Sequence, residues 1–163
     1  MTETTSRTPV PVRLDFDALA PGFSKALSHL DNAAKRELDR VQFDPKLREL
    51  VRIRASQLNG CAYCVDMHSK DARALGETEQ RIFALPVWEE TGFFSARERA
   101  ALAFAESVVR MADGHVPTEA FEAVAVELSP EEIAALVSLI VCVNAWNTVG
   151  VSTRPWEPGS YEG

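Results

Sequence analysis

The pair Asn59-Gly60 divides the most informative part of the sequence into two helix-sized segments. Phe43-Asp44-Pro45 stands before the first segment and supplies Asp as N-cap and Pro at the first helical position. This helix should run to Leu58 and end at Asn59-Gly60, because both residues tolerate positive φ. The second segment runs from Cys61 to Gly76, which stands where a C′ glycine is expected. The sequence therefore predicts an antiparallel helix hairpin.

The rest of the chain carries further helix signals. Ser95-Ala-Arg-Glu98 and Ser129-Pro-Glu-Glu132 are capping boxes, in which the first and fourth residues satisfy each other's backbone N–H groups. No stretch alternates apolar and polar residues with period two over the length of a strand. We expect further helices over residues 23–38, 78–84, 95–112, 117–127 and 129–149, with a loop around Pro86. The predicted fold is all-α, a single-domain helical bundle built around the hairpin.

Both ends of the chain are expected to lie outside this bundle. Residues 1–21 should form an extended N-terminal arm, because Pro9, Pro11 and Pro21 block regular structure. Residues 22–152 form the predicted helical domain, and 163 residues suit one domain. Residues 153–163 are broken by Pro and Gly and should pack on the surface as a C-terminal tail through Trp156 and Tyr161.

Charge and hydropathy exclude several kinds of partner. The formal net charge of −7 argues against a nucleic acid, because phosphate binding depends on clustered Lys and Arg. The N-terminus has no apolar core for a signal peptide, and the longest apolar stretch, 133–143, is shorter than the ~20 residues that span a bilayer. We therefore expect a cytoplasmic protein without a membrane partner. Thiols stay reduced there, so a C-x-x-C motif is more often redox-active or metal-binding than structural.

The C-x-x-C motif is Cys61-Ala-Tyr-Cys64. On a helix, Cys61, Cys64 and His68 fall on one inward face, and Asp66 and Lys70 take the opposite, solvated side. Residues three apart on a helix lie about 5–6 Å apart at Cβ, so the two thiols can form and break a disulfide with little backbone movement. The first turn of a helix also favours a thiolate. One of the two sulfurs should be the stronger nucleophile at pH 7.

A carboxylate partner for His68 follows from the hairpin. Counting ten residues from the turn in each direction pairs Glu49 with Lys70, within one helical turn of His68. A proton relay from Glu49 through His68 to a cysteine is therefore sterically reasonable. The helix pattern alone gives another interpretation, because Glu49 lies away from the main apolar face and would then be a solvated surface charge.

Other functions of the same residues stay open. Cys61, Cys64 and His68 could hold a structural zinc ion, with Glu49 or His115 as the fourth ligand. Structural zinc sites usually bring a second paired motif, which this sequence lacks, so thiol redox chemistry is favoured. A redox sensor would use the same disulfide chemistry. Separately, Cys142 fits a small buried hydrophobic residue, and His29 has no partner at a telling spacing.

The pattern Glu49-x11-Cys61-x-x-Cys64-x3-His68 resembles the alkylhydroperoxidase D branch of the carboxymuconolactone decarboxylase family. The resemblance is close over residues 45–76, and Asn144-Ala-Trp-Asn-Thr148 is also similar to that branch. It implies an all-helical, alkylhydroperoxidase D-like domain over residues 22–152 that assembles into trimers or hexamers. The best-known members carry His at the position of Tyr63, which here lines the entrance to the thiols or only packs.

The same resemblance implies a peroxidase with no cofactor besides its redox-active disulfide. Cys64 would be the peroxidatic cysteine, oxidised to a sulfenic acid by a hydroperoxide substrate, and Cys61 the resolving cysteine. Glu49 and His68 would form the proton relay. An external dithiol, a thioredoxin-like protein or a lipoyl carrier would reduce the disulfide again.

Overall fold

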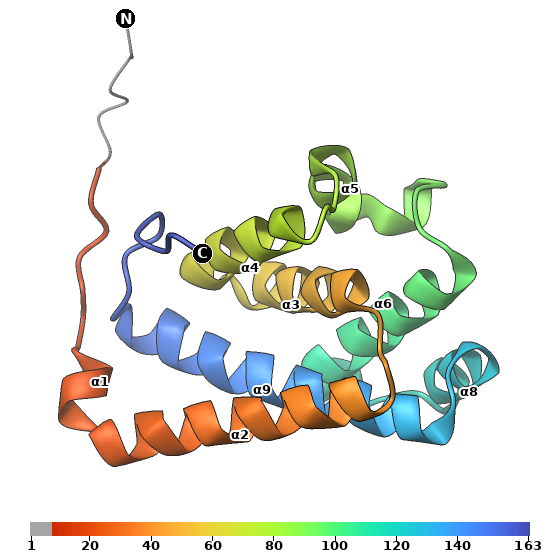
Figure 1. Ribbon diagram of the computed structural model, residues 1–163, viewed down its shortest axis with the longest axis horizontal. Coiled ribbons are helices and arrows are strands. Elements are labelled where there is room, and N and C mark those ends of the chain that lie inside the picture. The colour runs from red at the N-terminus through yellow and green to blue at the C-terminus, as the bar shows by residue number, and fades with distance from the viewer. Residues whose placement is uncertain (1–7) are drawn as a thin grey trace, which may run out of the picture.

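A computed structural model describes residues 8–163 of the chain. Within this range the regular secondary structure is helical and contains no strand, which confirms the predicted fold class (Figure 1). The elements in chain order are α1 (Phe16–Leu19), α2 (Pro21–Arg40), α3 (Pro45–Asn59), α4 (Ala62–Ala74), α5 (Glu79–Ala84), the 3₁₀ helix η1 (Leu85–Glu90), α6 (Ala96–Val109), α7 (Met111–Gly114), α8 (Thr118–Glu127) and α9 (Pro130–Thr153).

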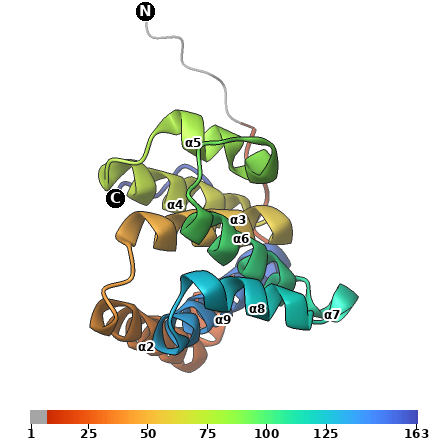
Figure 2. The same ribbon diagram turned by 90° about the vertical axis from the view of Figure 1, so that its right-hand side faces the viewer.

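The long helices α2 and α9 lie side by side, and the hairpin of α3 and α4 packs over them (Figures 1 and 2). Helix α3 is central, since it contacts α4, α6 and α9. The core lies where these helices meet. Its fully buried side chains include Leu47, Leu50, Ile53, Leu102, Leu136, Leu139 and Ile140. With its apolar side in this core, α3 turns its remaining side toward α4 and α2.

The helix boundaries follow the local signals in the sequence. The Asp44 side chain accepts a hydrogen bond from the backbone N–H of Leu47 at 2.9 Å, and Gly60 ends α3 with a φ of 72°. Both predicted capping boxes, at Ser95 and Ser129, are formed with their reciprocal hydrogen bonds. Because each cap satisfies backbone groups within four residues, these starts and stops can be predicted from local sequence.

The predicted extended arm is wrong at α1. Asp15 caps this short helix by accepting a hydrogen bond from the N–H of Ala18, so helix begins between the prolines of the arm. Residues 1–7 of the predicted arm lie outside the described range. The loop expected around Pro86 is the 3₁₀ helix η1, and the helix expected to reach residue 112 ends at Val109 and is followed by α7.

The two ends of the described chain meet near the end of α9. The backbone N–H groups of Arg13 and Leu14 both donate to the carbonyl of Thr153 at 3.0 Å. The tail after α9 then returns along α4, where Lys70 donates to the Tyr161 carbonyl at 2.7 Å. The tail therefore covers the side of α4 that the helix pattern assigned to solvent, because the pattern contains no information on segments that fold back over a helix.

Helix α9 has the length and apolar composition that a membrane-spanning helix needs. Residues 133–143, the stretch considered in the sequence prediction, are only part of this helix, and its apolar character continues beyond them. In the structure α9 packs against α2, α3 and α6, and its Leu136, Leu139 and Ile140 are fully buried. This is the position of a core helix.

Candidate active site

The turn between α3 and α4 brings the C-x-x-C motif to the start of a helix. Gly60 turns the chain with its left-handed backbone, and the N–H of Cys61 donates back to the Ser56 carbonyl at 2.9 Å. Cys61 is the N-cap of α4, and Cys64 lies in the first turn. The first N–H groups of the helix therefore surround the thiols, as the sequence predicts.

The two thiols lie in contact. Their Sγ atoms are 2.7 Å apart, and each residue is only 2% exposed. Cys64 lines a cavity, whereas Cys61 lies behind it against Gly150 of α9. A Cβ atom at Gly150 would come within 2.8 Å of the Cys61 sulfur, so only glycine fits here without a shift. Of the two sulfurs, Cys64 is the one that a ligand in the cavity would meet.

The pair shares charge unequally. The hydrogen bond from the Cys64 thiol, helped by the backbone N–H groups of Cys64 and Tyr63 and by the Asn147 side chain, lowers the pKa of Cys61 to about 7 against the effect of burial. The same bond between the sulfurs, together with burial, raises the pKa of Cys64. The pair thus carries one proton and one negative charge near neutral pH, with the charge centred on Cys61.

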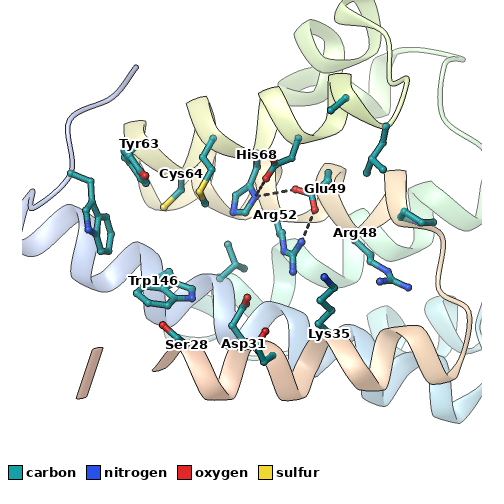
Figure 3. A pocket seen from close by; sticks show the side chains of 18 of the residues that line it. Ser28, Asp31, Lys35, Arg48, Glu49, Arg52, Tyr63, Cys64, His68 and Trp146 are labelled. Atoms are coloured by element: carbon teal, nitrogen blue, oxygen red, sulfur yellow. Dashed lines mark hydrogen bonds and ion pairs between the residues drawn. The ribbon is translucent and has the colours of Figure 1, made fainter. Parts of the chain in front are cut away.

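His68 lies one turn beyond Cys64 and is held by Glu49. The Nδ1 atom of His68 is 2.9 Å from Oε2 of Glu49, and Arg52 donates to the other carboxylate oxygen (Figure 3). Burial raises the pKa of Glu49, but the hydrogen bond from His68 and the charge of Arg52 outweigh burial and lower it. An ionised carboxylate only accepts hydrogen bonds, so the Nδ1 atom of His68 carries the proton. Nε2 remains for a second partner.

The contact between Glu49 and His68 is the one that counting along the hairpin predicts. Glu49 is 5% exposed, so the surface-charge interpretation is wrong. Glu49 does lie away from the apolar face of α3, but its side faces α4 and the cavity rather than solvent.

A cavity of about 860 Å³ opens beside these groups. Figure 3 shows that α4 and α3 form one wall and α2 the opposite wall, with Trp146 of α9 between them. Tyr63 lines the cavity and also packs, since its ring lies 5.4 Å from that of Trp156. Both roles left open for Tyr63 are therefore realised. The volume accommodates an organic molecule far larger than hydrogen peroxide.

The C-terminal tail completes the cavity wall. The Trp156 ring packs against Tyr63 and Trp146, and its indole N–H donates to Asp17 at 2.9 Å. Tyr161 donates its hydroxyl proton to Asp71 at 2.8 Å, and this bond raises the pKa of Tyr161 to about 12. The predicted surface packing of the tail through Trp156 and Tyr161 is thus part of the site.

Sequence reasoning missed two polar groups of the site, the half-buried Arg52 and the buried Asn147. Arg52 lies three residues after Glu49, a spacing that could have indicated an ion pair. Asn147 falls in the stretch 144–148, but nothing in its local sequence shows that it reaches residues 56–64. Cys142 is buried as predicted, and burial raises its pKa to about 11.

The proposed zinc ligands do not form a group. Within residues 8–163, potential ligand atoms that lie within 4.8 Å of one another belong to Glu49, His68 and Asp71 rather than to the thiols. His115 is exposed after α7 and does not line the cavity, and His29 is exposed on α2. The site is better described as a thiol pair beside an imidazole and a carboxylate.

Three comparisons place the chain among known proteins. The carboxymuconolactone decarboxylase family model matches residues 21–107. The uncharacterized protein YdfG of Bacillus subtilis (strain 168) is 36% identical over 140 residues, which cover 86% of this chain and 92% of YdfG.

Solved structures agree with this assignment. An Agrobacterium tumefaciens protein of unknown function, for which a role as the antioxidant defence protein AhpD has been suggested, superimposes with a TM-score of 0.84 and 33% identity over 91% of this chain and 99% of its own. An uncharacterized peroxidase-related protein from Silicibacter sp. TM1040 shares the fold, with a TM-score of 0.69 and 19% identity over 98% of each chain. The family model matches more than half of the chain, and YdfG is similar over nearly its whole length. The chain therefore belongs to the carboxymuconolactone decarboxylase family.

Proposed function

We propose that the protein is a thiol-dependent peroxidase that reduces organic hydroperoxides through a redox pair formed by Cys61 and Cys64. One observation carries the proposal. The two sulfurs touch at the wall of a cavity, one turn from a histidine that is hydrogen-bonded to a buried carboxylate. The family membership and the suggested antioxidant role of the Agrobacterium relative support the same activity.

The first step uses the sulfur that reaches the cavity. The proton that the two thiols share moves from Cys64 to Cys61, and the Cys64 thiolate attacks one oxygen of the hydroperoxide. The O–O bond breaks, the Cys64 sulfur becomes a sulfenic acid, and the alkoxide takes a proton and leaves as the alcohol. The sulfur loses two electrons and the peroxide gains them.

The second step closes the disulfide. Cys61 gives up its proton and attacks the Cys64 sulfur, the S–O bond breaks, and hydroxide leaves as water. Summed over both steps, a thiol, a thiolate, a hydroperoxide and one proton give a disulfide, an alcohol and water. The sulfurs already lie close enough for this step with little backbone movement.

His68 and Glu49 supply the proton that the balance requires. Glu49 fixes the imidazole by accepting from Nδ1, so Nε2 is free to pass a proton between the cavity and the leaving group. The charge on Glu49 also stabilises the imidazolium form that appears during transfer. Arg52 keeps Glu49 ionised and in place.

A reductant must return the disulfide to its dithiol state. An external dithiol supplies the two electrons and two protons, and a thioredoxin-like protein or a lipoyl carrier is the proposed donor. No other cofactor is needed for this cycle. A cytoplasmic location, where such carriers are kept reduced, suits the same chemistry.

We also propose that the chain forms a homo-oligomer, a trimer or a hexamer. Large apolar side chains stand exposed on separate helices, among them Phe23 at 62%, Phe83 at 75% and Val126 at 82% exposure. Apolar surface of this kind is often covered by another subunit. Analytical ultracentrifugation gives the number of subunits, and a monomer at micromolar concentration would contradict this assignment.

Turnover with a dithiol tests the peroxidase directly. The purified protein is mixed with cumene hydroperoxide and dihydrolipoamide, and loss of peroxide is followed for the wild type and three variants. Cys64→Ser and Cys61→Ser should lose catalytic turnover, whereas Cys142→Ser is the matched control and should keep it, because Cys142 is buried away from the cavity. Equal rates in all four proteins, or no turnover in any, would contradict the proposal.

A further inference from the structure

Asn147 is a buried polar side chain in the most apolar helix of the protein. It is 1% exposed and lies on α9, one turn before Gly150. A Cβ atom added at Gly150 would meet the Cys61 sulfur. A carboxamide removed from water destabilises the fold unless its N–H and carbonyl groups find partners. The partners of Asn147 therefore indicate what it does.

Two hydrogen bonds fix the orientation of the Asn147 carboxamide. Asn59 donates from Nδ2 to the Asn147 Oδ1 atom at 2.9 Å, so the carbonyl of Asn147 points toward the end of α3. The nitrogen then points the other way, and it donates to Oγ of Ser56 at 3.0 Å. An amide nitrogen carries two N–H groups, and the Ser56 hydroxyl takes one of them. The second N–H is left for another acceptor.

The contacts of Ser56 and Gly150 lead from this nitrogen toward the thiol pair. Ser56 is joined to Cys61 through the bond from the Cys61 N–H to the Ser56 carbonyl, and α9 reaches the Cys61 sulfur through Gly150. Asn147 is thus connected to Cys61 through Ser56 of α3, and it lies one turn from Gly150 on α9. The bond between the two sulfurs moves their pKa values apart, and the Asn147 side chain lowers the pKa of both Cys61 and Cys64.

We propose that Asn147 donates a hydrogen bond to the cysteine pair and stabilises the negative charge on whichever sulfur carries it. A donor shared by both sulfurs remains engaged when the proton passes from Cys64 to Cys61, so the charge can move to the cavity-facing sulfur without losing this partner. The side chains of Asn59 and Ser56 hold the Asn147 carboxamide in place and are positioning residues. The inference deepens the proposed redox function and rests on it, since it concerns the reactivity of the same thiols.

Thiolate absorbance near 240 nm, recorded against pH without any peroxide, tests the inference. In the wild type the first titration midpoint should lie near 7. In Asn147→Ala it should rise by about one unit, which lowers the thiolate fraction at pH 7 from about one half to about one tenth, roughly fivefold. Asn147→Asp keeps an oxygen for Asn59 and removes the N–H groups, and its added negative charge also disfavours a thiolate, so its midpoint should rise and only an unchanged midpoint in this variant is decisive.

Asn144→Ala is the matched control. Asn144 accepts from the same Nδ2 atom of Asn59 at 2.8 Å and lies one turn away on α9, but it is Asn147 that donates to Ser56 beside Cys61. Its midpoint should equal that of the wild type. An unchanged midpoint in folded Asn147→Ala or Asn147→Asp, or an equal rise in Asn144→Ala, would overturn the proposal. Where Asn147→Ala does not fold, as judged by circular dichroism, the uncharged Ser56→Ala variant decides, and it should raise the midpoint by a smaller amount.

The failure of this inference is distinguishable from failure of the proposed function. If the wild type titrates near 7 and the Asn147 variants titrate higher, but hydroperoxide is not turned over, the role of Asn147 stands and the peroxidase proposal fails. If the wild type turns over hydroperoxide but the Asn147 variants have the same titration midpoint as the wild type, the peroxidase proposal stands and the role of Asn147 fails.

Discussion

His68 and Glu49 face each other across the helix hairpin, with Nδ1 of His68 2.9 Å from Oε2 of Glu49. The two residues are 19 positions apart in the sequence, and only the turn at Gly60 brings them together. The contact links the imidazole beside the thiols to a carboxylate shielded from water.

Glu49→Gln should lower peroxide turnover by a factor on the order of 10², because the neutral amide neither fixes the proton on Nδ1 nor stabilises the imidazolium. Turnover with cumene hydroperoxide at saturating dithiol measures the effect. Glu37→Gln is the control, since Glu37 forms an exposed ion pair with Arg40 three residues away, the same spacing as between Glu49 and Arg52. Equal activity of the two variants would show that Glu49 has no part in proton transfer.

The reactivity of the thiols should depend on pH near neutrality. The pKa of Cys61 is lowered to about 7, so the pair is fully protonated below that value and carries its charge above it. Alkylation by iodoacetamide should therefore accelerate as the pH rises through 7 and level off by about pH 8.5. Cys142, with its pKa raised to about 11, should stay unmodified. A midpoint near the ordinary thiol value of ~8.5 would contradict the charge sharing between the sulfurs.

Gly150→Ala should destabilise the protein by roughly 1–3 kcal/mol, because the new Cβ meets the Cys61 sulfur at 2.8 Å and the surrounding residues must shift. Thermal unfolding followed by circular dichroism measures the change. In the control Gly22→Ala, the added Cβ meets nothing within 4 Å on α2, so stability should stay the same or rise by up to about 1 kcal/mol. A fully stable Gly150→Ala would mean that α9 does not pack closely on Cys61.

Much of the fold can be predicted from the sequence because helix boundaries depend on nearby residues. The capping boxes at Ser95 and Ser129, the Asp44 cap and Gly60 each act within four residues and were identified without the fold. The same is true of the contact between Glu49 and His68, since a tight turn fixes the register of the two helices. Helix α1 is not predicted, because the three prolines of the arm indicate an extended segment and the only helix signal between them is the Asp15 cap.

The rest of the site could not be predicted because it depends on contacts between distant segments. Asn147 reaches Ser56 across 91 positions, and Trp156 reaches Asp17 across 139. Neither contact leaves a local pattern, and both depend on how α9 and the tail pack. The tail also covers Asp66 and Lys70, which helical periodicity assigns to solvent.

Trp156→Ala should loosen the tail, because the indole packs on Tyr63 and Trp146 and donates to Asp17. Loss of this half-buried ring should destabilise the protein by about 2 kcal/mol, roughly 5 °C in Tm. The thiols should then react faster with a bulky disulfide reagent. Trp156→Phe keeps a ring against Tyr63, so its Tm should fall by less than that of Trp156→Ala. An unchanged Tm in Trp156→Ala would show that the tail does not depend on this contact.

The most direct test of the redox pair is the intact mass of the reduced protein after one equivalent of hydroperoxide, with peptide mapping of the product. We predict a loss of two hydrogen atoms per chain and a single disulfide between Cys61 and Cys64, with Cys142 still a free thiol. In Cys61→Ser the same treatment should instead leave Cys64 as a sulfenic acid that a dimedone probe captures. A wild-type protein that keeps all three thiols, or that links its chains through an intermolecular disulfide, would contradict the account.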